Sequence, residues 1–190
     1  TRTNRFEAAA IIQYIKDHLL SENRKSLGVV TFSQTQQNLI EDLLQAMYQE
    51  NPLAEAFALQ SEETIFIKNL ENVQGDERDI ILFSVGYGPD EDGKVAMNFG
   101  PLNREGGWRR LNVAVTRARY EMKVFSSLRS DQIDLNRTKS EGVRGLKEFL
   151  NFAEKGSSVL KLQNEKEDYI SIVNVISECI EQKGLNVQRY

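Results

Sequence analysis

Hydrophobic residues recur along the chain at spacings that alternate between those of amphipathic helices and those of buried strands. From Arg5 to Leu20 apolar residues return every three or four positions, which predicts a helix. The run from Leu27 to Phe32 is apolar without alternation, as in a parallel strand covered on both faces. A second amphipathic helix is predicted from Gln36 to Tyr48, and Pro52 is expected to end it. This rhythm predicts an α/β fold, a parallel sheet flanked by helices.

Two more strands are predicted in the middle of the chain, at Thr64 to Lys68 and at Asp79 to Val85. The second is the most apolar stretch of the sequence, so we expect it near the centre of the sheet. Between them, Asn69 to Arg78 is polar and too short for a crossover helix. It predicts a loop with one helical turn at a strand end, where α/β proteins bind ligands. The six glycines between Gly86 and Gly107 predict a long surface loop.

The stretch from Trp108 to Leu128 interleaves arginines with apolar residues, so one face is expected to be buried and another directed at a ligand. Its first half predicts a helix on which Arg110 and Arg117 project in the same direction. Tyr120 to Phe125 then predicts a strand entered directly from that helix.

The C-terminal part of the chain predicts further helices. An amphipathic helix is expected from Val143 to Ala153, with Gly156 as its breaker, and another apolar run extends from Tyr169 to Ile180. We therefore expect a first domain at residues 1–135, a helical connector at 136–158 and a distinct segment at 159–190. That segment is interpreted either as the start of another domain or as a helix packed on the first one.

Composition and charge restrict the classes of partner. With 24 basic and 28 acidic residues the formal net charge is -4, which argues against gripping nucleic acid through a generally basic surface. The single cysteine, Cys179, excludes a disulfide framework and suits a reducing cytoplasm. No apolar run approaches the ~20 residues of a membrane span, so we expect a cytoplasmic protein without a membrane partner. Because the chain opens with Thr1, we expect a domain excised from a longer protein.

Four segments carry a resemblance to a known family. In chain order they are NRFEA at Asn4 to Ala8, GVVTF at Gly28 to Phe32, VQGDERDIIL at Val73 to Leu82, and RRLNVAVTRAR at Arg109 to Arg119. The first resembles an N-R-x-E-A element, and the others resemble motifs IV, V and VI of superfamily 1 helicases. The nearest subgroup contains the RNA helicase of nonsense-mediated decay. The resemblance implies a RecA-like domain 2A, the C-terminal motor half of an ATP-dependent helicase or translocase.

The resemblance also implies roles for single residues. In this family ATP lies in the cleft between two RecA-like domains. By position, Arg117 is similar to the arginine finger at the γ-phosphate and Arg5 to a second arginine there. We accordingly expect both side chains on one exposed face at the carboxyl ends of the strands. Four further residues are implied at the nucleotide: Gln74, Gly75, Glu77 and Arg110. A permanently charged, forked guanidinium suits this role, because it can stabilise phosphoryl transfer by about 10³ to 10⁵ in rate.

Single-stranded nucleic acid, DNA rather than RNA, is the implied second ligand. The residues of motifs IV and V implied to contact it are Thr31, Ser33 and Asn69. The chain departs from the family here, since Phe32 and Ser33 stand where many relatives have Pro-Tyr. Asn69 and Glu71 likewise occupy positions that are Ser or Thr and Asp in the family.

Two signatures of a complete ATPase are missing from the sequence. It contains no GxxxxGK[ST] phosphate loop and no acidic metal motif, so we expect no metal site within it. ATP and Mg2+ would then be bound together with domain 1A of the same polypeptide, and the isolated chain is expected to be inactive. The alternative is a RecA-like module that binds protein or nucleic acid without catalysis.

Simpler interpretations stay open for the individual residues. Arg110 and Arg117 could form salt bridges with the sheet, Glu77 could be a helix-start charge, and Arg5 could be a frayed terminus. His18 is interpreted as a solvated or helix-end histidine.

A sharper hypothesis concerns the C-terminal segment. The loop from Gly100 to Gly107 is similar to that of bacterial relatives in which a restriction-endonuclease-like domain follows the helicase. Asp168 to Gln188 resembles the first helix and strand of that domain, whose catalytic residues would lie beyond Tyr190.

Overall fold

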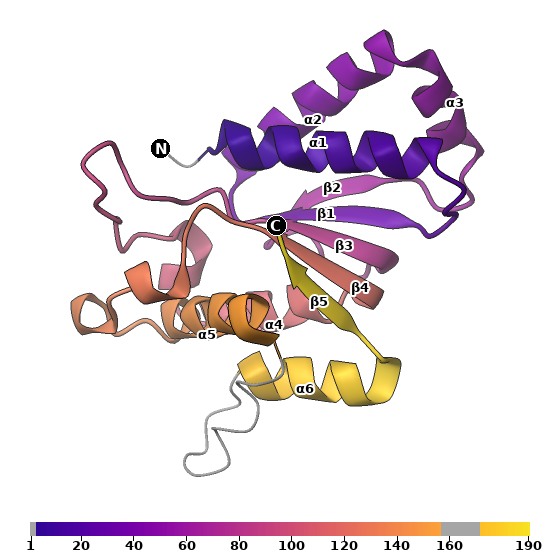
Figure 1. The fold of residues 1–190 in the computed structure, drawn as a ribbon. Coiled ribbons are helices and arrows are strands. Elements are labelled where there is room, and N and C mark those ends of the chain that lie inside the picture. The colour runs from indigo at the N-terminus through magenta and orange to yellow at the C-terminus, as the bar shows by residue number, and fades with distance from the viewer. Residues whose placement is uncertain (1–2, 157–171) are drawn as a thin grey trace.

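The structure is a computed structural model that describes residues 3–156 and 172–190, and in these residues a five-stranded parallel sheet lies between two layers of helices (Figure 1). The helices are α1 (Arg5–Leu20), α2 (Gln34–Glu50), α3 (Pro52–Gln60), α4 (Gly107–Val115), α5 (Glu141–Lys155) and α6 (Ile172–Lys183). The strands are β1 (Leu27–Thr31), β2 (Phe66–Asn69), β3 (Arg78–Ser84), β4 (Ala118–Phe125) and β5 (Asn186–Arg189). Three short 3-10 helices are η1 (Gly100–Asn103), η2 (Ser130–Gln132) and η3 (Leu135–Arg137).

The strand order is β2-β1-β3-β4-β5, and every neighbouring pair is parallel. The apolar strand β3 is central and buried from Ile80 to Ser84, as its composition predicts. The α/β fold with a RecA-like parallel sheet is thereby confirmed.

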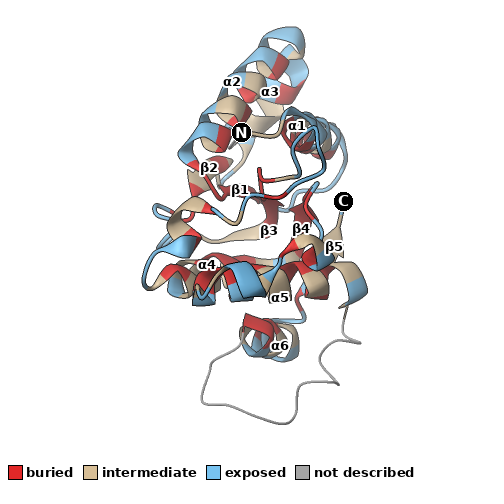
Figure 2. Ribbon diagram, turned by 90° about the vertical axis from the view of Figure 1, so that its left-hand side faces the viewer, coloured by how far each residue is buried: buried red, intermediate tan, exposed pale blue. Residues whose placement is uncertain are grey.

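Each face of the sheet has its own hydrophobic core. Helices α1, α2 and α3 cover one face, where Ile11, Ile15 and Ile40 are fully buried. Helices α4 and α5 cover the other, and α6 packs beneath them (Figure 2). Leu111 and Phe149 are fully buried in this core. The parallel arrangement therefore leaves only the two ends of the sheet for sites that need several strands.

Several elements differ from the sequence expectation. Helix α2 ends at Glu50, just before Pro52 as expected, but Pro52 also begins the unexpected helix α3, because proline at the first helical position loses no internal hydrogen bond. The segment at residues 70–77 forms turns and not a helical turn. Helix α4 ends at Val115, earlier than expected, because Ala118 already pairs with Arg78 of β3. The helical spacing that predicted a common direction for Arg110 and Arg117 therefore does not extend to Arg117.

The long loop before α4 is anchored in the hydrophobic core on the α4 and α5 side of the sheet. Phe99 and Leu102 are fully buried there. The Leu102 carbonyl accepts a hydrogen bond from Ser140 Oγ at 2.7 Å. A Cβ atom built at Gly107 or Gly142 would meet this same carbonyl oxygen at 2.5 or 2.1 Å, so glycine allows both helices to approach it. The segment that contains η1 is thus held firmly between α4 and α5.

The described C-terminal elements join the sheet. Strand β5 pairs with β4, and α6 contacts α4 and α5. The ammonium group of buried Lys123 donates to Gln188 Oε1 at 2.9 Å and to the Tyr190 hydroxyl at 2.8 Å. Tyr169 and Asp168 lie outside the described residues, and a further domain after Tyr190 stays a prediction. Among the described residues, no helix has the length and apolar character needed to cross a membrane.

Candidate nucleotide and nucleic-acid sites

Arg117 lies where the chain passes from α4 into the amino end of β4. Its Nε donates to the Val113 carbonyl at 3.0 Å, and its Nη2 donates to Thr116 Oγ1 at 3.0 Å. Its Nη1 lies 3.9 Å from Glu77 Oε1, beyond hydrogen-bond distance. The C-terminal end of α4 therefore fixes the Arg117 guanidinium. Its Nη1 edge faces the loop that precedes β3.

That loop, residues 70–77, carries the other residues expected at the nucleotide. Gln74 and Gly75 are exposed, and Gly75 has a φ of 90°, a left-handed conformation that favours glycine. The Glu77 side chain is 41% exposed. Arg110 on α4 is half-buried, and its side chain has no hydrogen bond or ion pair to another residue that the structure describes. The structure thus brings Arg117 and Glu77 together and leaves Gln74, Gly75 and Arg110 accessible.

Arg5 lies at the opposite end of the sheet. It begins α1 directly after Asn4, whose Nδ2 donates to Ser127 Oγ at 2.6 Å, and Ser127 follows the carboxyl end of β4. Arg117 instead precedes the amino end of that strand. Eight extended residues span about 26 Å, so one phosphate cannot contact both guanidiniums on this domain. The expectation that both face the carboxyl ends is wrong for Arg117, because α4 enters β4 at its amino end.

The start of α1, which carries the N-R-x-E-A segment, has a structural role at the carboxyl end of the sheet. The buried carboxylate of Glu7 accepts hydrogen bonds from Gly86 N at 2.7 Å, Ser127 N at 2.9 Å and Ser84 Oγ at 3.0 Å. Burial raises the pKa of Glu7, against the opposing effect of these donors. Gln36 completes the cluster by donating to Ser84 Oγ at 2.9 Å. These residues of the N-R-x-E-A and motif IV segments therefore tie α1 and α2 to the ends of β3 and β4.

The amino end also holds an ion-pair network that is structural. Arg119 donates to both carboxylate oxygens of Glu63, at 2.7 and 2.9 Å, and lies 3.5 Å from Asp79. The hydrogen bonds from Arg119 lower the pKa of Glu63 to about 2. The neighbouring Arg78 lies 3.8 Å from Glu63. Salt bridging to the sheet was the open alternative for Arg110 and Arg117, yet it is Arg119 that lies beside Asp79 of β3.

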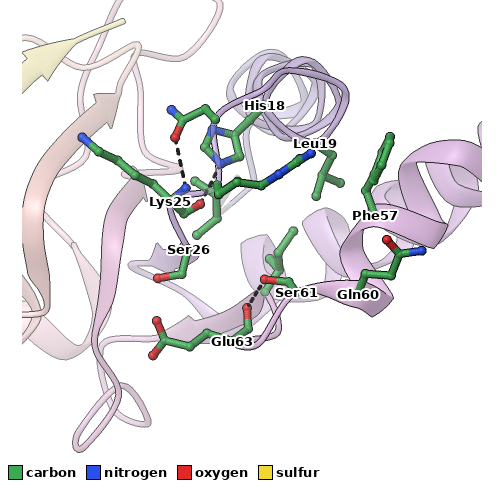
Figure 3. A pocket seen from close by; sticks show the side chains of 12 residues that line it. His18, Leu19, Lys25, Ser26, Phe57, Gln60, Ser61 and Glu63 are labelled. Carbon is green, nitrogen blue, oxygen red and sulfur yellow. Dashed lines mark hydrogen bonds between the residues drawn. The ribbon is translucent and has the colours of Figure 1, made fainter.

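A hollow of about 180 Å³ adjoins Glu63 between α1, α3 and the start of β1 (Figure 3). His18 lines it and places its Nε2 2.7 Å from the carbonyl oxygen of Lys25. Only 8% of His18 is exposed, and burial lowers its pKa. His18 is therefore neither solvated nor free, because its ring ties the end of α1 to the turn before β1.

Thr31, Ser33 and Asn69 gather at the carboxyl ends of β1 and β2. Thr31 is fully buried and its Oγ1 donates to the Ser33 carbonyl at 3.0 Å, while Ser33 caps α2. The Nδ2 of Asn69 donates to Gln34 Oε1 at 2.7 Å and to Gln37 Oε1 at 3.0 Å. These three expected nucleic-acid residues are thus close together, and each already has hydrogen-bond partners within the domain.

A groove of about 440 Å³ opens beside them and is walled on its far side by the loop of η1. Its polar lining residues are Ser33, Gln34, Asn69, Glu71, Tyr87, Asn98, Asn103 and Arg104. The loop residues Asn98, Asn103 and Arg104 were not predicted, because their glycine-rich context indicates only a surface loop. A long loop packed beside two strand ends is the signal that could have found them.

No metal-binding cluster accompanies these sites in the described part of the chain. Groups of three or more His, Cys, Asp or Glu residues with suitable geometry are absent from it. The acidic turn at Asp90 to Asp92 is instead closed by its own hydrogen bonds, since Asp90 Oδ1 accepts from Lys94 N at 2.7 Å. The part of the chain described here therefore offers an arginine and polar groups, and no carboxylate cage.

The parallel sheet with helices on both faces defines the chain as an α/β domain of the RecA-like class. The model of the AAA domain family matches residues 1–129, and the chain belongs to this family.

Two relatives carry a helicase name. The chain is 37% identical over 166 residues to the uncharacterized ATP-dependent helicase MG140 of Mycoplasma genitalium, a match covering 84% of the chain and 14% of that protein. It is 38% identical over 154 residues to the MG140 homolog of Mycoplasma pneumoniae, covering 78% of the chain and 13% of that protein. The chain thus spans about one seventh of these relatives.

Proposed function

We propose that the chain is domain 2A of an ATP-dependent superfamily 1 nucleic-acid helicase or translocase, in the subgroup of the nonsense-mediated-decay helicase. The observation that carries the proposal is the fixed guanidinium of Arg117 beside Glu77 at the amino end of the sheet. The names of the two relatives support an ATP-dependent motor, and their much greater length leaves room for a second domain.

At the proposed ATP site Arg117 acts as the arginine finger. Val113 and Thr116 hold its Nε and Nη2, so the guanidinium needs little reorganisation when negative charge develops on the transferred phosphoryl group. Glu77 accepts from the ribose, and exposed Gln74 and Gly75 border the nucleotide together with half-buried Arg110. Arg5 is too distant to share this phosphate, so we place it outside the site.

The rest of the ATP site belongs to another domain in this proposal. Domain 1A of the same cytoplasmic polypeptide would contribute the phosphate loop and the carboxylates for Mg2+, which this sequence lacks. The isolated chain should then hydrolyse no ATP. An arginine supplied across a domain cleft makes turnover depend on closure of the two domains.

Nucleic acid binds in this proposal at the opposite, carboxyl end of the sheet. Ser33 and Asn69 line the groove there. Buried Thr31 supports it from behind through its hydrogen bond to the Ser33 carbonyl, and Asn69 is held by Gln34. Loop 70–77 starts after Asn69 and ends at Glu77, so it runs from the groove to the ATP site. A strand bound at one end can therefore influence the arginine at the other through this loop. Single-stranded DNA is the polymer we expect.

The test is an ATPase assay of the full-length protein with single-stranded DNA and RNA side by side. We expect turnover that rises when a strand is added, more with DNA than with RNA. Binding of nucleic acid without any ATP turnover would instead indicate a non-enzymatic RecA-like module and contradict the proposal.

A further inference from the structure

One ion pair crosses the mouth of the groove at the carboxyl end of the sheet. Arg104 Nη1 lies 3.5 Å from Glu71 Oε1. Arg104 follows η1, whereas Glu71 lies at the start of loop 70–77. Their side chains are 69% and 45% exposed, so water screens the pair and its net contribution to stability is small. An exchange of partners at this position therefore costs the fold little.

The backbone that carries Arg104 is well fixed despite the exposure of the side chain. Asn103 Nδ2 donates to the Met97 carbonyl at 2.9 Å, and its Oδ1 accepts from Phe99 N. Leu102, two residues before Arg104, is fully buried and held by Ser140. Arg104 thus places an exposed side chain on a well-anchored backbone at the edge of the groove.

The groove is lined by few charged residues. Its other polar lining residues are uncharged amides and hydroxyls, so Arg104 is the one cation and Glu71 the one anion among the described lining residues. Neutral amides can accommodate a nucleotide but cannot neutralise a phosphate. A strand that enters the groove therefore has a single cation available, and that cation is paired with a carboxylate that repels phosphate.

We propose that Arg104 is a phosphate-binding residue of the nucleic-acid groove and that Glu71 is the partner it exchanges for a strand phosphate. The inference rests on the proposed binding of nucleic acid at this end of the sheet. It assigns opposite effects to two residues in contact. Arg104 strengthens binding, whereas Glu71 weakens it by competing for the same guanidinium.

The experiment measures binding of fluorescently labelled dT20 and dA20 by the full-length protein, using anisotropy at several salt concentrations. Arg104→Ala should weaken binding about 10-fold for both strands, as loss of a charged hydrogen bond does. Equal losses are expected because phosphate contacts read no base. The slope of log K against log salt should fall by about 0.7, the value for one phosphate contact on a single strand. Glu71→Gln should instead tighten binding about 2- to 5-fold.

A matched control is Arg24→Ala, which removes an exposed arginine at the amino end of the sheet and should leave the affinity unchanged. Arg104→Lys should restore part of the affinity because it restores the charge. Thermal melting of each variant checks that the domain remains folded.

Two results would overturn the inference while leaving the proposed function intact. One is wild-type affinity and salt slope for Arg104→Ala. The other is a change of equal sign for Arg104→Ala and Glu71→Gln, which would mean that the pair only supports the fold. If the wild-type protein binds neither the DNA strands dT20 and dA20 nor the RNA strand rU20, both the inference and the proposed function fail.

Discussion

Arg117 Nη1 lies 3.9 Å from Glu77 Oε1, and this pair joins the end of α4 to the end of loop 70–77. The same two segments meet again at the far end of the sheet, through Arg104 and Glu71. The loop therefore approaches the segment from η1 to β4 near both of its ends, each time with an arginine opposite a glutamate. Because the distance between Arg117 and Glu77 exceeds that of a hydrogen bond, Glu77 holds Nη1 only weakly, and a ligand oxygen can replace it as the acceptor.

Glu77 is expected to contribute to ATP binding by contacting the ribose, and to contribute little to the chemical step. Glu77→Gln in the full-length protein should raise KM for ATP about 5-fold and change kcat less than about 2-fold, because a ribose contact is equal in ground and transition states. Steady-state kinetics with a saturating single strand measures both constants. The control is Glu22→Gln, an exposed carboxylate in the turn after α1. A large fall in kcat at unchanged KM would refute the ribose role.

The 190-residue chain alone should bind ATP weakly or not at all. Its sequence lacks a phosphate loop, so the backbone amides that cradle the β- and γ-phosphates would have to come from another domain. Isothermal titration calorimetry of the chain with Mg-ATP tests this. Micromolar or tighter binding would show that the nucleotide site is complete without a second domain.

Protonation of Glu63 in acid should lower the stability of the domain. Its folded-state pKa, about 2, lies below the ordinary value of 4.5, so its contribution is present above about pH 5 and is lost as the pH falls toward 2. Because Glu63 is about one-third exposed, screening limits the effect to about 1 kcal/mol, or about 2 to 4 °C in Tm.

The measurement compares Tm of the wild type and Glu63→Gln between pH 7 and pH 2.5. The variant should melt lower at pH 7, and the difference should shrink steadily below about pH 4.5, with only a minor part left at pH 2.5. Glu7 has a raised pKa and so contributes a dependence of the opposite sign, but it is common to both proteins and cancels in the difference. A difference that is constant with pH would exclude the ion pair as its cause.

The fold could be predicted largely from periodicity. The bounds of α1, Arg5 to Leu20, are those expected, because a strong apolar stripe and an Asn4 cap agree. The end of α4 could not be read in the same way. Ala118 continues the helical spacing, yet its backbone pairs with Arg78 of a strand that is distant in sequence. Tertiary pairing thus overrode a local pattern.

The candidate site was predicted less completely than the fold. The motif order points to Arg117 and Glu77, and the structure brings them together. The order of the motifs does not reveal which end of the sheet each motif occupies. The resemblance therefore places Arg5 at a phosphate that it cannot share with Arg117. Arg104 was missed for a related reason. Its partner Glu71 comes from another loop, and no local pattern records a contact between two loops.

The central claim is that Arg117 supplies the arginine finger of an ATP site shared between domains. The most direct measurement is the strand-stimulated kcat of the full-length protein with Arg117→Ala, beside Arg109→Ala as an exposed control from the preceding helix α4. We predict a loss of about 10³-fold or more for Arg117→Ala, a similar loss for Arg117→Lys, and nearly unchanged turnover for the control. Thermal melting should show that all three variants remain folded. Wild-type turnover by folded Arg117→Ala would contradict the account.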